Sequence, residues 1–374
     1  MTRPVLDPSH IMQVGMGFFG SRTLLTAVEL ELFTHLRAGK LTGEAIARRL
    51  RLHPRAIPDF PDALVALGVL DRDGDGPDAL YGNTTETAMF LDKKSPQYIG
   101  GILEMASSRL YQFWGNLTEA LQTGQPQNEI KDSGEPLFAK LYAAPERLEQ
   151  FMNAMAGVSA GNFKALAEKF DFSRYETLCD AGGATGQLSC MVAAANPHMR
   201  CISADLPPVE PIAKRRIAQV GLSDRVTTAP IDFFADPLPK ADVITMGMIL
   251  HDWNLEKKKH LIKLAYDALP PGGAFIVVEA LIDDARRENA FGLLMSLNML
   301  VEFGDAFDYT ARHQPQSRTN PGRDAGPSLY TRLPHRQRHR FRDVHVRQEA
   351  APASPARVRP AAPAPAVLRV KAGL

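Results

Sequence analysis

The chain has 374 residues, enough for two domains, and 45% of them are hydrophobic, which is ordinary for a soluble globular protein. Its net charge of +1 conceals two opposite parts: residues 311–374 hold 12 Arg, one Lys and three acids, whereas the rest of the chain carries 30 basic and 39 acidic side chains. An acidic body gives no electrostatic reason to bind nucleic acid, so we expect no nucleic-acid partner.

The first residues contain one apolar run, 11–19, which is short and is interrupted by Gln13 and two glycines. It is too short for a membrane span and lacks a small-residue cleavage site, so we expect neither a signal peptide nor a membrane partner. The cysteines Cys179, Cys190 and Cys201 form no C-x-x-C pair and are expected to pack inside the protein in a reducing compartment. These features predict a cytoplasmic protein.

The N-terminal region has the order of elements of a winged helix. Apolar spacing predicts a helix over 24–37 and, after a cap at Thr42, a second helix over 45–50. A third helix over 63–67 precedes two short strands joined by a glycine-containing turn. This order predicts a mainly α-helical, winged-helix-like domain over residues 1–100.

A winged helix can serve as a dimerisation scaffold or as a reader of DNA. The stretch in which a recognition helix would lie, 54–65, offers Arg55 alone against Asp59 and Asp62. Binding to phosphates needs a surplus of basic side chains. We therefore favour the scaffold and expect a homodimer.

The most informative segment is the run D-A-G-G-A-T-G from Asp180 to Gly186, which directly follows the strand-like residues 177–179. Glycines in such a turn let a ligand approach the backbone, because a Cβ there would clash or forbid a positive φ. A helix starting near Gly186 would aim its free N–H groups into the same crevice. The spacing differs from the G-x-G-x-x-G of dinucleotide binders, so alone it does not identify a ligand.

The residues that follow alternate between strands and helices. Strands are predicted over 200–204, 225–231, 241–248 and 274–278, and helices over 209–220, 254–269 and 287–301. Asp205, His251 and Glu279 follow predicted strands, and an open parallel sheet binds its ligands at the carboxyl ends of its strands. An acid roughly 20 residues after a glycine turn, such as Asp205, is placed to bind ribose hydroxyls.

Five short motifs accompany the glycine turn: D-L-P at 205–207, D-F-F at 232–234, H-D-W at 251–253, P-G-G at 271–273 and V-V-E at 277–279. Their order resembles the class I S-adenosylmethionine-dependent small-molecule O-methyltransferases, the group that includes plant phenolic, acetylserotonin and bacterial polyketide O-methyltransferases. The resemblance covers residues 18–309. It implies a Rossmann-like α/β methyltransferase domain over 171–310, behind the dimerisation domain and connecting helices over 101–170.

The resemblance implies S-adenosylmethionine as the cofactor. The residues it assigns to the cofactor are Asp180, Gly182, Gly183 and Gly186 at the methionine end, Asp205 and Leu206 at the ribose, and Asp232, Phe233 and Trp253 around the adenine. Ala184 stands where the family commonly has a third glycine, a departure expected to weaken cofactor binding without abolishing it.

The connecting helices of the family roof the acceptor pocket. In this chain their aromatic and Met-rich segments are 110–114 and 151–155, which offer Trp114 and Met155 as contacts for an acceptor. Met is polarisable and adaptable, which suits a flat aromatic molecule. The alternative is that both side chains belong to the core.

His251 is the candidate general base. Methyl transfer from a sulfonium is an in-line displacement, and a phenol with a pKa near 10 is a poor nucleophile until it loses its proton. Histidine titrates near 6.5 and can take that proton. Glu279 could accept a hydrogen bond from the other ring nitrogen, and the resemblance implies these roles for both. The alternative is a surface histidine that caps the helix at Asn254.

Two features of the family site cannot be assigned from the sequence. A second acid often follows the helix that here ends near Glu302, but that position falls at the start of an atypical tail. No second His or acid stands at ligand spacing from His251 and Asp252, so we expect no metal site.

From residue 311 the chain becomes rich in Arg, Pro, His and Ala, with nine prolines. Apolar periodicity does not extend beyond a few residues, so we expect a largely disordered segment. The resemblance implies a further helix and two strands here. Their absence from the pattern suggests that the reading frame shifts shortly after Tyr309; the alternative is a real basic tail that binds RNA or an acidic membrane.

The sequence thus predicts a metal-independent O-methyltransferase acting on a hydroxylated aromatic or polyketide-like small molecule. Two alternatives stay open. One is methyl transfer to carbon or nitrogen on the same scaffold, and the other is a non-catalytic S-adenosylmethionine-binding pseudoenzyme.

Overall fold

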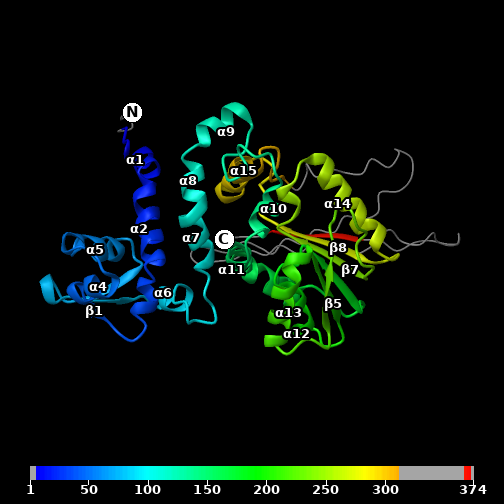
Figure 1. Cartoon of the computed structure of the whole chain (residues 1–374), viewed down its shortest axis with the longest axis horizontal. Helices are drawn as coiled ribbons and strands as arrows, with labels where there is room; N and C mark the ends of the chain where they lie inside the picture. The colour runs from blue at the N-terminus through cyan, green and yellow to red at the C-terminus, as the bar shows by residue number, and fades with distance from the viewer. Residues whose placement is uncertain (1–5, 311–365, 372–374) are drawn as a thin grey trace, which may run out of the picture. The chain divides into compact units, whose positions relative to one another are not determined.

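The computed structural model describes residues 6–310 and the strand 366–371, and the statements below concern these residues (Figure 1). The chain divides into two compact units, residues 1–112 and 113–374. Among the described residues, none of the helices combines the length and the apolar character needed to cross a membrane.

The first unit is mainly helical. Its elements are α1 (Ser9–Gly15), α2 (Gly17–Glu29), α3 (Leu32–His35), β1 (Leu41–Thr42), α4 (Gly43–Leu50), η1 (Pro54–Ala56), α5 (Asp59–Ala66), β2 (Leu70–Asp73), η2 (Gly76–Asp78), β3 (Leu80–Asn83), α6 (Thr85–Phe90), α7 (Gly101–Met105) and the π-helical turn η3 (Ala106–Leu110). The strands form an antiparallel sheet in the order β1-β3-β2. This confirms the predicted helical domain and its β-wing, and Thr42 caps α4 by accepting the N–H of Ala45.

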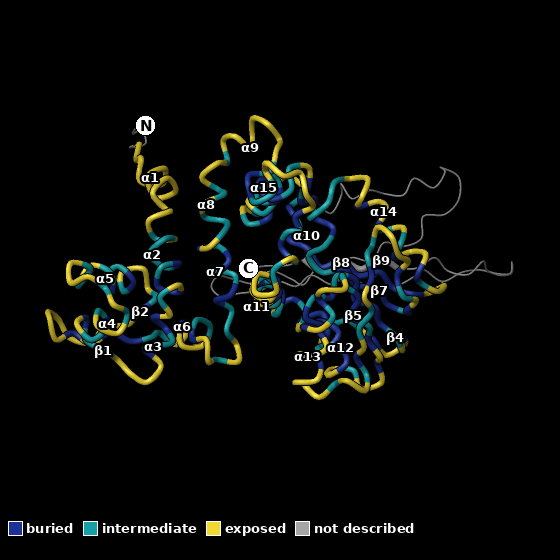
Figure 2. Tube along the Cα trace, viewed as in Figure 1, coloured by how far each residue is buried: buried dark blue, intermediate teal, exposed yellow. Residues whose placement is uncertain are grey.

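One N-terminal helix was predicted with the wrong limits. The predicted helix 24–37 is in fact two helices, α2 and α3, because Glu31 between them adopts a left-handed φ of 54°. In addition, α2 starts seven residues earlier than predicted, at Gly17. The turn directs Leu32 and Phe33 into the core, where both are fully buried. By contrast, none of the residues of α1 is buried, and Figure 2 shows this helix exposed along its length.

The second unit is an α/β fold. Its elements, after α8 (Tyr111–Trp114) at the boundary, are α9 (Leu117–Thr123), α10 (Leu137–Tyr142), α11 (Pro145–Lys169), β4 (Thr177–Ala181), α12 (Gln187–Ala195), β5 (Arg200–Asp205), η4 (Pro207–Val209), α13 (Glu210–Gln219), β6 (Val226–Pro230), β7 (Val243–Gly247), η5 (Leu250–Asp252), α14 (Leu255–Ala268), β8 (Ala274–Glu279), α15 (Ala290–Phe303) and β9 (Ala366–Lys371). The predicted strands and helices of this unit are all present, with ends shifted by a few residues.

The sheet has the strand order β6-β5-β4-β7-β8-β9, and all its pairs are parallel. Side chains alternate between its faces, as the pleat requires. Leu178 and Val243 pack in the cluster that includes α12 and α13, whereas Cys179 and Ile244 pack in the opposite cluster with α14. Burial of Cys179 and Cys201 confirms their predicted packing role, and Cys190 is partly buried.

The chain runs outward from β4 to β6 and then returns to the other side of β4 as β7. Strands β4 and β7 are therefore neighbours whose connections leave in opposite directions. This is a topological switch point, where the loops at the carboxyl ends of the strands separate and leave a crevice for a ligand.

The described part of the tail corrects one expectation. Residues 366–371 form β9, which pairs with β8 from Ala274↔Ala366 to Glu279↔Lys371, although no strand was predicted after residue 311. The run A-V-L-R-V-K is apolar enough for an edge strand but too short to be recognised by periodicity. The expected disorder of the other tail residues and the reading-frame hypothesis lie outside the described residues.

Candidate active site

Residues from four strands meet at the carboxyl edge of the sheet. The glycine turn follows β4, Asp205 ends β5, His251 lies in η5 just after β7, and Glu279 ends β8. The loop after α15 reaches the same edge, because the N–H of Ile282 donates to the carbonyl of Tyr309. The first four of these positions were predicted from the sequence, whereas in the last loop the resemblance implied a second acid that was not assigned to a residue.

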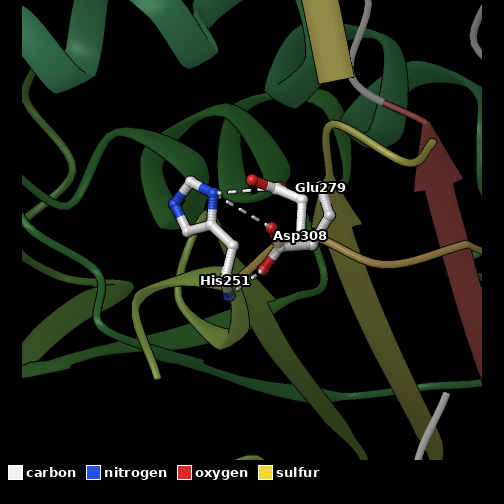
Figure 3. A group of neighbouring side chains, drawn as sticks. All are labelled: His251, Glu279 and Asp308. Atoms are coloured by element: carbon white, nitrogen blue, oxygen red, sulfur yellow. Dashed lines mark hydrogen bonds and ion pairs between the residues drawn. The ribbon is translucent and has the colours of Figure 1, made fainter. Parts of the chain in front are cut away.

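His251 is buried between acidic side chains (Figure 3). Its Nδ1 lies 3.3 Å from Oδ1 of Asp308 and 3.6 Å from Oε2 of Glu279. Its Nε2 lies 3.3 Å from Oδ1 of Asp252. The ring is therefore held on one side by two carboxylates from distant parts of the chain and faces a third carboxylate on the other.

Asp308 takes the position that was expected for Glu279. The hydrogen bond to Nδ1 comes from Asp308, whereas Oε1 of Glu279 accepts the backbone N–H groups of Leu250, at 2.9 Å, and of His251, at 3.4 Å. Glu279 thus fixes the backbone of η5 and contributes its charge to the ring. The family resemblance implied a second acid after the helix that ends near Glu302 but did not assign it to a residue; Asp308, 57 residues from His251, lies in such a position.

The acids decide the charge of the ring. Burial alone would lower the pKa of His251, but Glu279, Asp252 and Asp308 together outweigh it and raise this pKa to about 10. Burial raises the pKa of Asp252 to about 7, and it also raises the pKa of Glu279. The acids around the ring therefore favour the imidazolium form of His251 at neutral pH.

The sequence argument against a metal site rested on the spacing of residues along the chain, whereas the fold brings distant residues together. Single ligand-type atoms of His251, Glu279 and Asp308 all lie within 4.8 Å of one another. Two cations, His251 and the buried Lys258 of α14, already compensate the local acids. The expected absence of a metal stays a prediction.

The glycine turn is tightly packed on the protein itself. Gly182 has a φ of +78°, and a Cβ there would lie 2.2 Å from Cδ1 of Ile249. A Cβ on Gly183 would lie 2.3 Å from Oγ of Ser203, and Gly186 has a φ of +74° at the start of α12. Ala184, in the place of the family's third glycine, has a φ of +47°. Alanine is strained in this left-handed conformation, which explains why glycine is usual there.

Asp205 closes the turn from the neighbouring strand. Its Oδ2 accepts the N–H of Ala184 at 2.8 Å, and its Oδ1 accepts the N–H of Leu206 at 2.7 Å. Burial raises its pKa to about 6 against these two hydrogen bonds, so the carboxylate is ionised at neutral pH. A partly exposed carboxylate beside a glycine turn fits the hydroxyls of a ribose.

Asp180 lies deeper. It is buried in β4 and accepts a hydrogen bond of 2.7 Å from the hydroxyl of Thr245 on β7, and burial raises its pKa to about 7. This geometry makes Asp180 a support beneath the turn; direct contact with the cofactor stays a prediction.

The residues predicted around the adenine are gathered on the same edge. Phe233 is partly buried beside Gly182, and the carboxylate of Asp232 accepts the N–H of Phe234. Phe234 packs edge-to-face on Trp253, with ring centroids 4.8 Å apart. The indole Nε1 of Trp253 is buried without a hydrogen-bond partner among the described residues.

Trp253 also belongs to an aromatic cluster that the sequence did not reveal. The aromatic cluster comprises Phe138, Tyr142, Phe151, Trp253 and Phe303. Phe138 of α10 is its centre, with ring centroids 5.7–6.3 Å from those of the other four members. Burial, followed by the charges of Asp205 and Asp252, raises the pKa of Tyr142 well above its ordinary value.

Tyr142 is therefore close enough to Asp205 and Asp252 for their charges to act on its hydroxyl. The aromatic density of 138–151 was the signal that could have indicated the cluster. Trp114 donates from Nε1 to Oδ1 of Asn298 on α15 at 2.8 Å, and Met155 is partly buried on α11. Their predicted contact with an acceptor stays untested.

Comparisons with known proteins agree with this arrangement. Residues 114–312 match the model of the O-methyltransferase domain, and residues 12–93 match that of the O-methyltransferase dimerisation domain. The chain is 41% identical to the tetracenomycin polyketide synthesis 8-O-methyl transferase TcmO of Streptomyces glaucescens, over 82% of this chain and 88% of TcmO. It is 36% identical to the N,N-dimethyltransferase OxyT of Streptomyces rimosus, over 81% and 87% of the two chains.

Among solved structures, human N-acetylserotonin methyltransferase in complex with S-adenosylmethionine is similar to this chain. It superposes with a TM-score of 0.76 at 30% identity, over 83% of this chain and 91% of the human chain. The family matches, the dimerisation domain and the site at the switch point lead to one conclusion: this chain belongs to the S-adenosylmethionine-dependent O-methyltransferases.

Proposed function

We propose that this enzyme methylates a phenolic hydroxyl of a polycyclic aromatic, polyketide-like acceptor, with His251 handling the phenolic proton. The observation that carries the proposal is the buried cluster of His251, Asp308 and Glu279, one strand away from the glycine turn. S-adenosylmethionine supplies an electrophilic methyl group on a sulfonium. The residues of this chain have to provide a nucleophilic oxygen opposite it.

The charge of the cluster suits a phenol. An unperturbed phenol and the imidazolium of His251 both have a pKa near 10, so a proton between them is shared almost evenly. An imidazolium can therefore bind the phenolate by a charge-assisted hydrogen bond, and a neutral His251 is a strong enough base to take the proton of a bound phenol. These two descriptions have the same number of protons and predict the same dependence on His251.

The other side of the ring has to be free for the acceptor. Nδ1 is engaged by Asp308 and Glu279, so Nε2 is the nitrogen that would meet the phenol. Asp252 lies 3.3 Å from Nε2, so an acceptor hydroxyl has to approach this nitrogen beside the Asp252 carboxyl group. We propose that the aromatic cluster binds the flat rings of the acceptor, because stacked and edge-to-face contacts favour them.

We also propose that the enzyme acts as a homodimer through α1 and α2. Five large apolar side chains of these helices are at least half exposed: Ile11, Met12, Val14, Phe18 and Phe19. Such a patch on a helix of a soluble protein usually marks an interface. It lies within the region that matches the dimerisation domain.

The test begins with binding of S-adenosylmethionine to the full-length protein, measured by calorimetry. Hydroxynaphthoic acids and larger polycyclic phenols are then offered as acceptors, and the methylated atom is located by NMR of the product. A phenolic methyl ether is expected. Cofactor binding without turnover of any acceptor in the panel would favour the pseudoenzyme.

N-methylation is the second candidate, because the chain is also 36% identical to an N,N-dimethyltransferase. An aromatic amine is already neutral at neutral pH and needs no base before the transfer, so N-methylation would leave the cluster of His251, Asp308 and Glu279 without a role in preparing the acceptor. Amino analogues of the same polycyclic phenols, assayed side by side, separate the two reactions. Faster methylation of the amines would replace the O-methyl proposal.

A further inference from the structure

Lys258 is a charged side chain in the core of the second unit. It lies on α14 with none of its surface exposed, and lysine is almost never fully buried unless it is paired. Its Nζ donates to the backbone carbonyl of Trp253 and, at 2.8 Å, to that of Phe307. The ammonium also lies 3.7 Å from the centroid of the Phe307 ring, within the range of a cation–π contact.

The two carbonyls belong to the segments that carry His251 and Asp308. Trp253 lies two residues after His251, and Phe307 immediately precedes Asp308. One ammonium therefore joins Trp253 and Phe307, which are 54 residues apart in sequence and lie within two residues of His251 and Asp308, respectively. A lysine has three donors on a compact head, so it can hold both carbonyls at once.

Neighbouring contacts fix the same junction. Asn254 caps α14 by accepting the N–H of Lys257 and donates from Nδ2 to Oδ2 of Asp305 at 2.7 Å. The N–H of Asp308 donates to Oγ of Ser296 on α15 at 3.2 Å. The loop 305–308 is thus held against α14 and α15, and Lys258 connects it to the backbone carbonyl of Trp253.

The ammonium also has an electrostatic reason to be there. Burial lowers the pKa of Lys258, and the charges of the nearby acids Glu279, Asp308, Asp252 and Asp305 limit the net decrease to a pKa of about 8, so the side chain stays mainly protonated at neutral pH. Replacing it with an apolar residue would leave two buried carbonyls without a donor and the acids with one counter-charge fewer.

We propose that Lys258 is a positioning residue for methyl transfer: by holding the carbonyls of Trp253 and Phe307, it keeps Asp308 against Nδ1 of His251. The expected effect of Lys258 on kcat rests on the proposed function, whereas its expected effect on the contact between Asp308 and His251 does not. Lys258 does not face the acceptor, and its effect passes through Asp308 and the orientation of the imidazole.

The test compares Lys258→Met with Lys259→Met in the full-length protein. Met keeps the length of the stem and removes the donors, and Lys259 is the matched control because it is half-exposed on the same helix and forms a surface ion pair with Glu256. For K258M we expect kcat to fall about 10–100-fold, the loss typical for outer partners of a functional histidine at metal sites. The Kd of S-adenosylmethionine should change by no more than a few-fold, and K259M should stay near wild type.

A second readout does not depend on activity. In protein labelled with ¹⁵N-histidine and saturated with S-adenosylhomocysteine, the Nδ1–H of His251 that bonds Asp308 should give a downfield, slowly exchanging signal. We expect K258M to weaken or remove this signal, as Asp308→Asn should, and K259M to retain it. If wild type methylates no phenol, the proposed function fails, and this signal still decides the role of Lys258.

A double mutant separates positioning from general stability. In the D308N background K258M should reduce kcat little further, because the contact that Lys258 maintains is already lost. Full additivity, or a K258M protein with a lower Tm but an unchanged kcat and His251 signal, would overturn the proposal. If K258M does not fold, Lys258→Gln retains a donor without the charge or the reach; wild-type kcat and an intact His251 signal in K258Q would also overturn it.

Discussion

Nδ1 of His251 lies 3.3 Å from Oδ1 of Asp308, although 57 residues separate the two in the chain. The contact commits Nδ1 to the protein, whereas Nε2 faces Asp252 and is the nitrogen proposed to meet the acceptor. It also adds to the charges that hold the imidazole protonated.

Replacing His251 with Ala tests the reaction itself. The cofactor contacts are predicted on other loops, so the affinity for S-adenosylmethionine should stay within a few-fold while kcat falls about 10²–10⁴-fold. The rate of His251→Ala should be partly restored with an acceptor phenol that is already ionised at assay pH, because such a phenol needs no base. Single-turnover rates with a series of phenols measure this, and a wild-type rate for a high-pKa phenol would reduce the site to proximity and orientation.

The titration of His251 has a defined direction. Its pKa is raised from 6.5 to about 10, so its contact with the acids stabilises the folded protein fully below about pH 6.5 and is lost as the pH rises through about 10. Asp308→Asn removes one attractive charge and should lower the midpoint of His251, followed by NMR of the labelled ring. An unchanged midpoint in D308N would mean that Glu279 and Asp252 alone set the charge.

Asp205→Ala tests the cofactor site. Loss of two charge-assisted hydrogen bonds to the ribose should cost about 1.5–3 kcal/mol, or roughly 10–150-fold in Kd for S-adenosylmethionine. The same change frees the N–H of Ala184, which Asp205 now accepts, so the turn loosens as well. Asp205→Asn keeps a carbonyl acceptor for one N–H and should lose less. Calorimetric titrations that give equal Kd values for wild type and D205A would remove Asp205 from the site.

Phe138→Ala tests the aromatic cluster. Its ring is packed against four others, so truncation should open the surface on which the acceptor is proposed to lie. We expect KM for a polycyclic phenol to rise about tenfold, the effect of losing 1–1.5 kcal/mol of aromatic contact, with little change in the Kd of S-adenosylmethionine. Phe170→Ala is the control, because Phe170 packs on Phe172 and Tyr175. Equal KM values for wild type and F138A would exclude the cluster from acceptor binding.

The dimer is tested on the exposed face of α1 and α2. Ile11 and Phe19 are 74% and 57% exposed, so changing both to Ser removes little from the core of the first unit but should weaken a dimer built on them. Sedimentation velocity should show a monomer at concentrations at which wild type is dimeric. Val220→Ser, at a position 57% exposed on the second unit, should leave the dimer intact. A dimeric I11S/F19S protein would move the interface elsewhere.

The order of the elements in the second unit and the ends of its strands could be predicted from local sequence patterns. Each strand from β4 to β8 is a short apolar run and each helix has its own spacing, so these elements follow from local pattern. Gly182 and Gly186 indicate the turn, because the positive φ values at these positions are readily accessible only to glycine. The parallel series then brings Asp205, His251 and Glu279 to one edge, since the carboxyl ends of parallel strands coincide.

The contacts between side chains that are distant in sequence depend on the tertiary structure. Asp308 and Lys258 lie in segments without a motif, and their contacts depend on how the loop after α15 closes on α14. The same holds for the aromatic cluster, which joins α10, α11, α15 and Trp253. Local spacing reports the face that an element buries, whereas a contact across 57 residues depends on the packing that offsets the entropy of closing the loop, and no single segment encodes that.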